Sequence, residues 1–250
     1  MLSLVVVAVL SAPTAVGARW TWTLDDSISA KVTPDDISFR AKPSLGKTTF
    51  EVEVHEAGEN GWKKLRATAL QGAAKGRKWE LQNNSGDVEL RALTKKIATD
   101  VDYEEMVAAR EAELNNTMLR VSRLLVQPDP IVTASAGGTC TPEVRAAMLK
   151  AVSKAVARTT SQRGEPSDET VGEVTCGKPG HYDVKYTTSD TVGADVKFVM
   201  NWKGTVDVPA GALNATLKLT GTIDSTVELQ RKKRRITGRM TLNSTVTPKK

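Results

Sequence analysis

Aromatic residues, histidines and cysteines are all scarce in this chain of 250 residues. Aromatic side chains make up only 4% of the sequence, so a buried core must consist mainly of Val, Leu, Ile, Met and Ala. The only two histidines, His55 and His181, lie far apart, and neither has a Cys or a GxSxG motif beside it. Nucleophilic catalysis needs a Ser, Cys or Thr next to a base, and a metal site needs several clustered ligands. The sequence therefore predicts no catalytic residue, no metal ligand and no cofactor-binding residue.

Recognisable nucleotide-binding motifs are absent as well. The chain contains neither a Walker-type phosphate loop nor a Rossmann-type glycine pattern. Neighbouring acids such as Asp25–Asp26 and Glu104–Glu105 are expected to diverge, because adjacent side chains on strands and helices point in different directions. We therefore predict a non-enzymatic protein. A hydrolase whose acidic residues come together from distant positions is the alternative that these observations leave open.

Only one long hydrophobic run is present, at residues 1–10, and it is too short to span a bilayer. The small residues Val16, Gly17 and Ala18 follow it, which is typical of a signal peptide cleaved after Ala18. The run has no preceding Lys or Arg, which departs from that pattern and leaves a buried strand as the alternative. We expect a signal peptide over residues 1–18 and a secreted or periplasmic protein that is not integral to the membrane.

The two cysteines, Cys140 and Cys176, are an even number in a chain expected to be exported, and this favours a disulfide bond. The bond would close a loop of about 37 residues and stabilise the fold by about 4 kcal/mol in the chain-entropy model. Two unpaired buried thiols are the alternative if the chain is not exported.

Alternating apolar and polar residues are the strongest signal in the chain. Alternation from Leu213 to Gln230 is almost unbroken, and a period of two predicts a strand with one buried face. Similar segments predict an N-terminal β meander over residues 19–93, with about four to six short strands, and a C-terminal antiparallel β meander over residues 176–250. Residues 19–250 can form one domain, in which the two meanders share one sheet or make two.

Residues 94–175 change to helical spacing and form a two-helix region with a surface loop. Apolar residues recur at helical intervals over residues 94–126. A second helix is expected after Thr141, with Thr141 as its N-cap and Pro142 at its first position. The predicted fold class is therefore α+β: an antiparallel β-sheet with two amphipathic helices inserted between the meanders and packed on it.

The turns predict a register for the C-terminal strands. A four-residue turn at Pro209–Ala212 would place Gly204 opposite Leu217 and Met200 opposite Gly221. A turn centred on Lys232–Lys233 would place Ser225 opposite Met240.

A basic run at this second turn is the first candidate site. The net charge of the chain is +6, and five consecutive bases could hold phosphate, lipopolysaccharide or anionic lipid head groups. Solvated charges that prevent long strands from pairing end to end are the competing interpretation. The run contains no aromatic residue, so a nucleic-acid partner is not expected. The candidate anion-binding residues are Arg231, Lys232, Lys233, Arg234 and Arg235.

The long apolar sheet face is the second candidate site, because it exceeds what two helices of moderate length cover. It could bind an apolar ligand or lipid between a curved sheet and the helices. The candidate residues are Phe198, Met200, Trp202, Leu217, Leu219, Ile223, Met240 and Leu242. Taken together, the sequence predicts an exported, non-enzymatic cell-envelope or secreted protein that serves as a structural, interaction or binding module. A carrier of an apolar ligand is the alternative.

Overall fold

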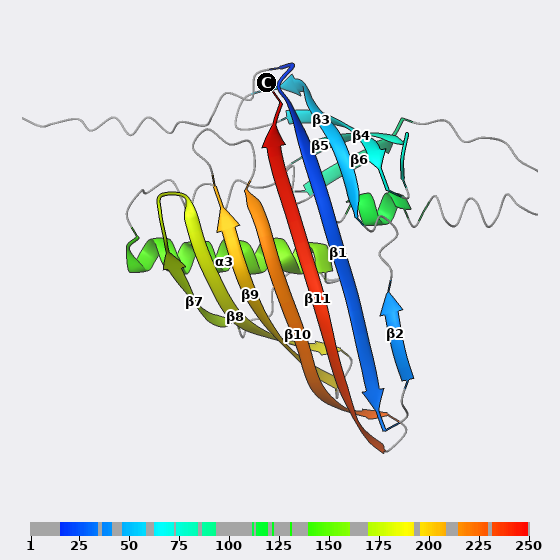
Figure 1. Cartoon of the computed structure of the whole chain (residues 1–250), viewed down its shortest axis with the longest axis vertical. Helices are drawn as coiled ribbons and strands as arrows, with labels where there is room; N and C mark the ends of the chain where they lie inside the picture. The colour runs from blue at the N-terminus through cyan, green and yellow to red at the C-terminus, as the bar shows by residue number, and fades with distance from the viewer. Residues whose placement is uncertain are drawn as a thin grey trace, which may run out of the picture.

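An antiparallel sheet of eleven strands dominates the computed structural model (Figure 1). The structure describes residues 16–34, 37–41, 47–58, 63–72, 74–84, 87–93, 112, 114–119, 122, 131, 140–160, 170–192, 196–208, 215–229 and 232–249. The first six strands are β1 (Arg19–Thr33), β2 (Ile37–Ala41), β3 (Thr48–Ala57), β4 (Lys63–Gln71), β5 (Lys78–Asn84) and β6 (Asp87–Ala92). Helix α3 (Pro142–Thr160) follows, and then β7 (Val171–Cys176), β8 (His181–Val192), β9 (Val196–Asp207), β10 (Thr216–Leu229) and β11 (Lys232–Pro248).

The two predicted meanders form one continuous sheet. The strand order is β6-β5-β4-β3-β1-β11-β10-β9-β8-β7, with β2 paired to β1 outside this path. The seam between the meanders is the antiparallel pair of β1 and β11, which runs from Trp20 opposite Pro248 to Thr33 opposite Arg235. The α+β prediction is confirmed at the level of an antiparallel sheet with helices packed on it.

Strand alternation separates a buried face from a polar face, as predicted. In β3 and β4, the side chains of Phe50, Val52, Val54 and Leu65 are fully buried, and their neighbours in sequence are partly or fully exposed. Trp22 of β1 stacks on Phe50 with ring centroids 5.0 Å apart, and its Nε1 donates a buried hydrogen bond to Ser244 Oγ. These contacts place an aromatic core under the N-terminal half of the sheet.

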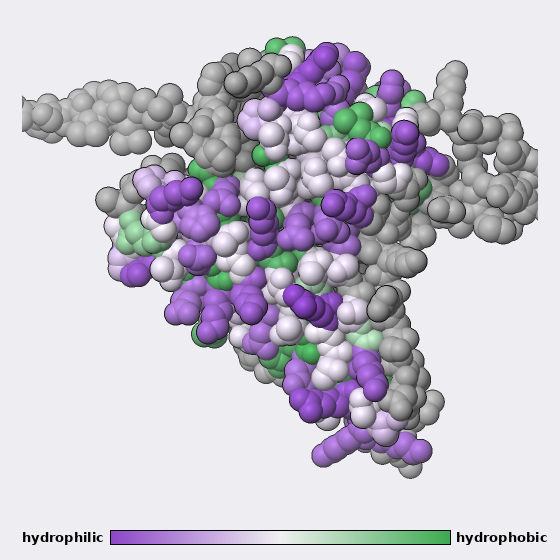
Figure 2. All heavy atoms as spheres, in the orientation of Figure 1, coloured by the Kyte–Doolittle hydropathy of each residue, from purple (hydrophilic) through white to green (hydrophobic). Residues whose placement is uncertain are grey.

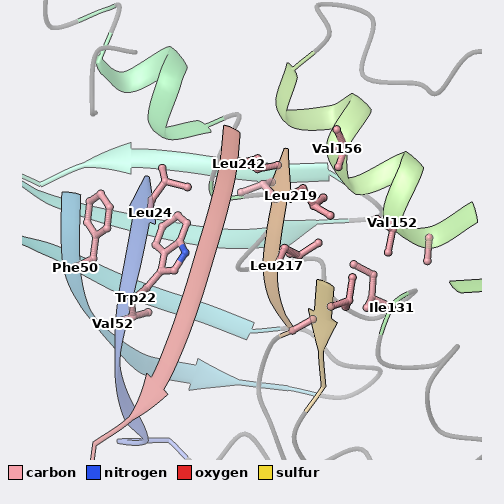
Figure 3. Close-up of a cluster of buried hydrophobic side chains, with 14 of the residues drawn as sticks. Trp22, Leu24, Phe50, Val52, Ile131, Val152, Val156, Leu217, Leu219 and Leu242 are labelled. Carbon is pink, nitrogen blue, oxygen red and sulfur yellow. The ribbon is translucent and has the colours of Figure 1, made fainter. Parts of the chain in front are cut away.

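Helix α3 begins where its capping signals predict. The backbone N–H of Val144 donates to the Thr141 hydroxyl over 3.3 Å, which satisfies one of the free amides of the first turn. The helix buries Met148, Val152 and Val156, and its residues Val152 and Val156 lie near Leu217 and Leu219 of β10 (Figure 3). This apolar stripe holds α3 across the C-terminal strands.

The predicted helix over residues 94–126 lies mostly outside the described residues. Residues 114–119 are helical, and Leu114 and Met118 are buried in the same core as the sheet. The Nε1 of Trp79 in β5 donates to Asn115 Oδ1 over 2.9 Å. This segment therefore covers the N-terminal strands, whereas α3 covers the C-terminal ones.

The disulfide between Cys140 and Cys176 is present, with the two Cα atoms 6.0 Å apart. Cys140 lies immediately before α3, and Cys176 is the last residue of β7. The bond thus ties the start of α3 to an edge strand of the sheet, as the sequence predicts.

The predicted strand register was wrong by a small, even number of residues. Gly204 faces Leu219 instead of Leu217, and Gly221 faces Trp202 instead of Met200. In the last hairpin, Ser225 faces Ile236 instead of Met240. Strand β10 ends at Leu229 and β11 begins at Lys232, so the turn is centred two residues before the predicted centre at Lys232–Lys233. An even shift leaves every side chain on its predicted face of the sheet, so the predicted buried and polar rows remain correct. Residues 209–212, the other predicted turn, lie outside the described residues.

Candidate functional site

Strands β7–β10 contain both regions that we consider as candidate sites, one on the apolar face of the sheet and one on the polar face. In Figure 1, α3 crosses these strands, and the space-filling view in the same orientation shows a mainly hydrophilic surface over them (Figure 2). The apolar face carries α3, and the polar face carries the alternating charged, Thr and Asn side chains.

On the apolar face, the predicted ligand-binding residues divide into two groups. Five are at most 6% exposed and belong to the hydrophobic core: Trp202, Leu217, Leu219, Met240 and Leu242. Phe198, Met200 and Ile223 are only partly buried and lie toward the end of the sheet where β8 joins β9 and β10 joins β11. Most of the predicted apolar surface is therefore filled by the protein's own side chains.

An aromatic pair with glycines on both sides runs across this face. Gly172, Tyr186, Trp202 and Gly221 are successive register partners on β7, β8, β9 and β10. The Tyr186 and Trp202 rings are stacked, with centroids 6.4 Å apart. A Cβ atom on Gly221 would lie 2.9 Å from the Trp202 ring, so a larger residue would displace the indole.

The Tyr186 hydroxyl is the most unusual polar group in this region. Tyr186 is 2% exposed, and its hydroxyl has no hydrogen-bond partner among the residues that the structure describes. Burial raises the pKa of this phenol far above its ordinary value, because the charged form would be desolvated. The hydroxyl therefore stays neutral, and it remains an unsatisfied donor inside the C-terminal half of the molecule.

On the polar face, the same strands line a hollow of about 470 Å³. Eight of its eleven lining residues belong to two polar rows of the sheet: Val171, Glu173, Lys185, Thr187, Asn201, Lys203, Thr220 and Thr222. Lys185 and Lys203 are direct register partners on β8 and β9. The Thr187 hydroxyl donates to Asn201 Oδ1 over 2.7 Å.

The basic run lies at the β10–β11 hairpin, and its charges are partly balanced within the protein. Lys232, Lys233 and Arg235 are exposed, and Arg231 lies outside the described residues. Arg235 donates two hydrogen bonds to the Asp224 carboxylate, over 2.9 and 2.7 Å, and they hold the Asp224 pKa below its usual range. Glu228 is the register partner of Lys233. The run is therefore less positive as an assembled surface than its sequence suggests.

A His–Asp pair at one end of β8 and β9 was not identified from the sequence. The Nδ1 of His181 lies 2.6 Å from Asp207 Oδ1, and Nε2 lies 3.9 Å from Asp183. An aspartate can orient an imidazole as a base, but among the described residues no Ser, Thr or Cys side chain hydrogen-bonds to this ring. The pair instead joins two strands next to the turn at Lys178–Gly180, where the His181 amide donates to the Lys178 carbonyl.

His55 lies on a part-exposed strand position, with its Nε2 3.9 Å from a Glu56 carboxylate oxygen. Within the described ranges, no three His, Cys, Asp or Glu side chains gather closely enough to hold a metal ion.

The chain matches no known protein-family model and no curated protein sequence. In the part of the chain that the structure describes, no helix has both the length and the hydrophobicity needed to cross a bilayer.

Proposed function

We propose that this protein is an exported, non-enzymatic binding module of the cell envelope or the extracellular space. The filling of the apolar face is the observation that carries the proposal, because five of the eight candidate ligand-binding residues there belong to the protein's own core. Because the protein's own side chains fill the inner, apolar face of the sheet, a partner is expected to bind the outer face. The polar face of β7–β10 is the surface that we assign to binding.

The disulfide and the N-terminal sequence support export. A disulfide persists in oxidising compartments outside the cytoplasm. Strand β1 begins at Arg19, so cleavage after Ala18 leaves the whole strand in the mature protein. Expression of the full chain in a secreting host, followed by N-terminal sequencing, is expected to find Arg19 as the first residue. Retention of residues 1–18 on the secreted protein would contradict this part of the proposal.

A carrier of an apolar ligand is the second candidate function, and one local feature favours it. The unsatisfied Tyr186 hydroxyl lies on the apolar face, two residues along the register from the half-buried Met200 and Ile223. A ligand with an apolar body and one polar group would bury those side chains and accept a hydrogen bond from the phenol.

One measurement separates the two candidates. Native mass spectrometry of the secreted, disulfide-bonded protein is combined with analysis of an organic-solvent extract. A binding module that works through its polar face is expected to show the mass of the chain alone and an extract free of lipid. A stoichiometric lipid adduct that disappears in a Tyr186→Phe variant would replace the binding module by the carrier.

A further inference from the structure

The hollow on the polar face of β7–β10 has the size and chemistry of a small-molecule site. Its volume of about 470 Å³ lies within the range of about 300–1,000 Å³ that ligand pockets occupy. It is built on four adjacent strands of the sheet, so its walls are held in place by the backbone ladder. Val171 is the one aliphatic side chain among its polar-row residues, and the aromatic Tyr186 and Trp202 also line it.

Two lysines give the hollow a positive centre. Lys185 and Lys203 are directly opposite each other, and like charges in that position repel and destabilise a strand pair. Glu173 is the partner of Lys185 on its other side, whereas Lys203 has Thr220 there. Among the residues that the structure describes, neither lysine forms an ion pair. An anion bound between the two ammonium groups would relieve their repulsion.

Neutral hydrogen-bonding groups surround this centre. Thr187, Asn201, Thr220 and Thr222 line the hollow. Asn201 accepts the Thr187 hydroxyl through its Oδ1, which leaves its Nδ2 available to donate to a ligand. Threonine hydroxyls both donate and accept, and this matches a ligand that carries several hydroxyl groups.

We propose that this hollow binds an acidic sugar. Lys185 and Lys203 pair with the sugar carboxylate, and the Thr and Asn side chains bind its hydroxyl groups. This inference rests on the proposed function in that it names the ligand class of the binding module. It fails separately, because its test measures binding at the hollow and does not depend on export or on lipid content.

The test is isothermal titration calorimetry at low ionic strength, where surface charges are least screened. The full chain with its disulfide is titrated with sodium glucuronate, glucose and sodium sulfate. The variant is the double substitution Lys185→Gln and Lys203→Gln. The matched control is Lys75→Gln with Lys150→Gln, which removes two exposed lysines outside the hollow. Thermal unfolding is used to verify that both variants fold.

Glucuronate is expected to bind the wild-type protein and the control equally, and the Lys185/Lys203 variant at least about tenfold more weakly, as the loss of charge-assisted hydrogen bonds implies. Glucose and sulfate, which each supply only half of the proposed contacts, are expected to bind at least about tenfold more weakly than glucuronate. The proposal is overturned by absence of glucuronate binding or by equal binding to the Lys185/Lys203 variant. Sulfate binding as tight as that of glucuronate would also overturn it, because charge alone would then account for the site.

Discussion

The N-terminal half of the sheet (β1 and β3–β6) and the C-terminal half (β7–β10) differ in how completely their aromatic and apolar side chains are buried. In the N-terminal half, Trp22, Phe50 and Trp79 form a contiguous aromatic cluster, and the indole N–H groups of both Trp22 and Trp79 have partners. In the C-terminal half, the Tyr186 hydroxyl has none, and Phe198, Met200 and Ile223 are only half-buried.

We propose from this difference that the two halves of the continuous sheet have different roles, one in stability and the other in binding. The N-terminal half has a filled aromatic core, although the buried Trp20 Nε1 has no hydrogen-bond partner among the described residues. The other half has a polar hollow, a repelling lysine pair and an unsatisfied phenol, which are features that a ligand can complete. We therefore assign stability to β1 and β3–β6 and binding to β7–β10.

The largest expected effect comes from opening the N-terminal core. Trp22→Ala is expected to lower the free energy of unfolding by about 5 kcal/mol, because a fully buried indole is lost and the Ser244 hydroxyl loses its donor. The matched substitution in the other half, Phe198→Ala, is expected to lower it by less than about 2 kcal/mol, because that ring is only half-buried. Urea unfolding followed by circular dichroism measures both. Equal losses would remove the contrast between the halves.

Removing the disulfide is expected to have the next largest effect. Cys140→Ser with Cys176→Ser should lower the free energy of unfolding by about 4 kcal/mol, since the bond closes a loop with a sequence separation of 36 residues. Differential scanning calorimetry of the oxidised wild type and the double variant measures this loss. An unchanged melting temperature would show that α3 stays on the sheet without the link to β7.

Two buried hydroxyls provide a smaller and more local test. Ser244→Ala leaves the buried Trp22 N–H without a partner and is expected to destabilise the protein by about 2 kcal/mol. Tyr186→Phe removes an unsatisfied group and is expected to stabilise it by about 1 kcal/mol. Chemical denaturation of the two variants side by side checks the opposite signs. Destabilisation by Tyr186→Phe would mean that the phenol has a partner in solution.

The smallest effect is expected at the β10–β11 hairpin. Hydrogen bonds from Arg235 lower the Asp224 pKa, so this pair contributes stability above the carboxyl's unfolded pKa, near 3.8. That contribution is lost as the pH falls from there through the lower folded pKa. Asp224→Asn should therefore reduce stability slightly at pH 7 and not at all at the most acidic pH. Melting curves across this pH range, with and without added salt, check the prediction.

Local elements of the fold were predictable from the sequence, whereas the pairing of distant strands was not. Alternation identified the strands and the buried rows, and the Thr141 cap, Pro142 and the cysteines identified α3 and its anchor. The alternation and the helix cap are local signals, and the disulfide joins the only two cysteines in the sequence. The continuous sheet was not predictable, because it depends on the pairing of β1 with β11 across nearly the whole chain.

The candidate sites depended on exact register, which the sequence left uncertain. The face of each side chain follows from parity, but the opposition of Lys185 to Lys203 requires the length of the β8–β9 turn. The Arg235–Asp224 pair likewise required the β10–β11 register. The His181–Asp207 pair had a sequence signal, since both residues flank the predicted strands at the same end, but only the register brings them together.

Hydrogen–deuterium exchange of the disulfide-bonded protein tests the division between the halves most directly. Strands β4 and β9 are each third from an edge of the sheet, and Leu65, Ala67, Met200 and Trp202 each have register partners on both sides. We predict that amides of β9 around Met200 and Trp202 exchange at least about tenfold faster than those of β4 around Leu65 and Ala67. Equal protection of the two strands would contradict the assignment of stability to one half and binding to the other.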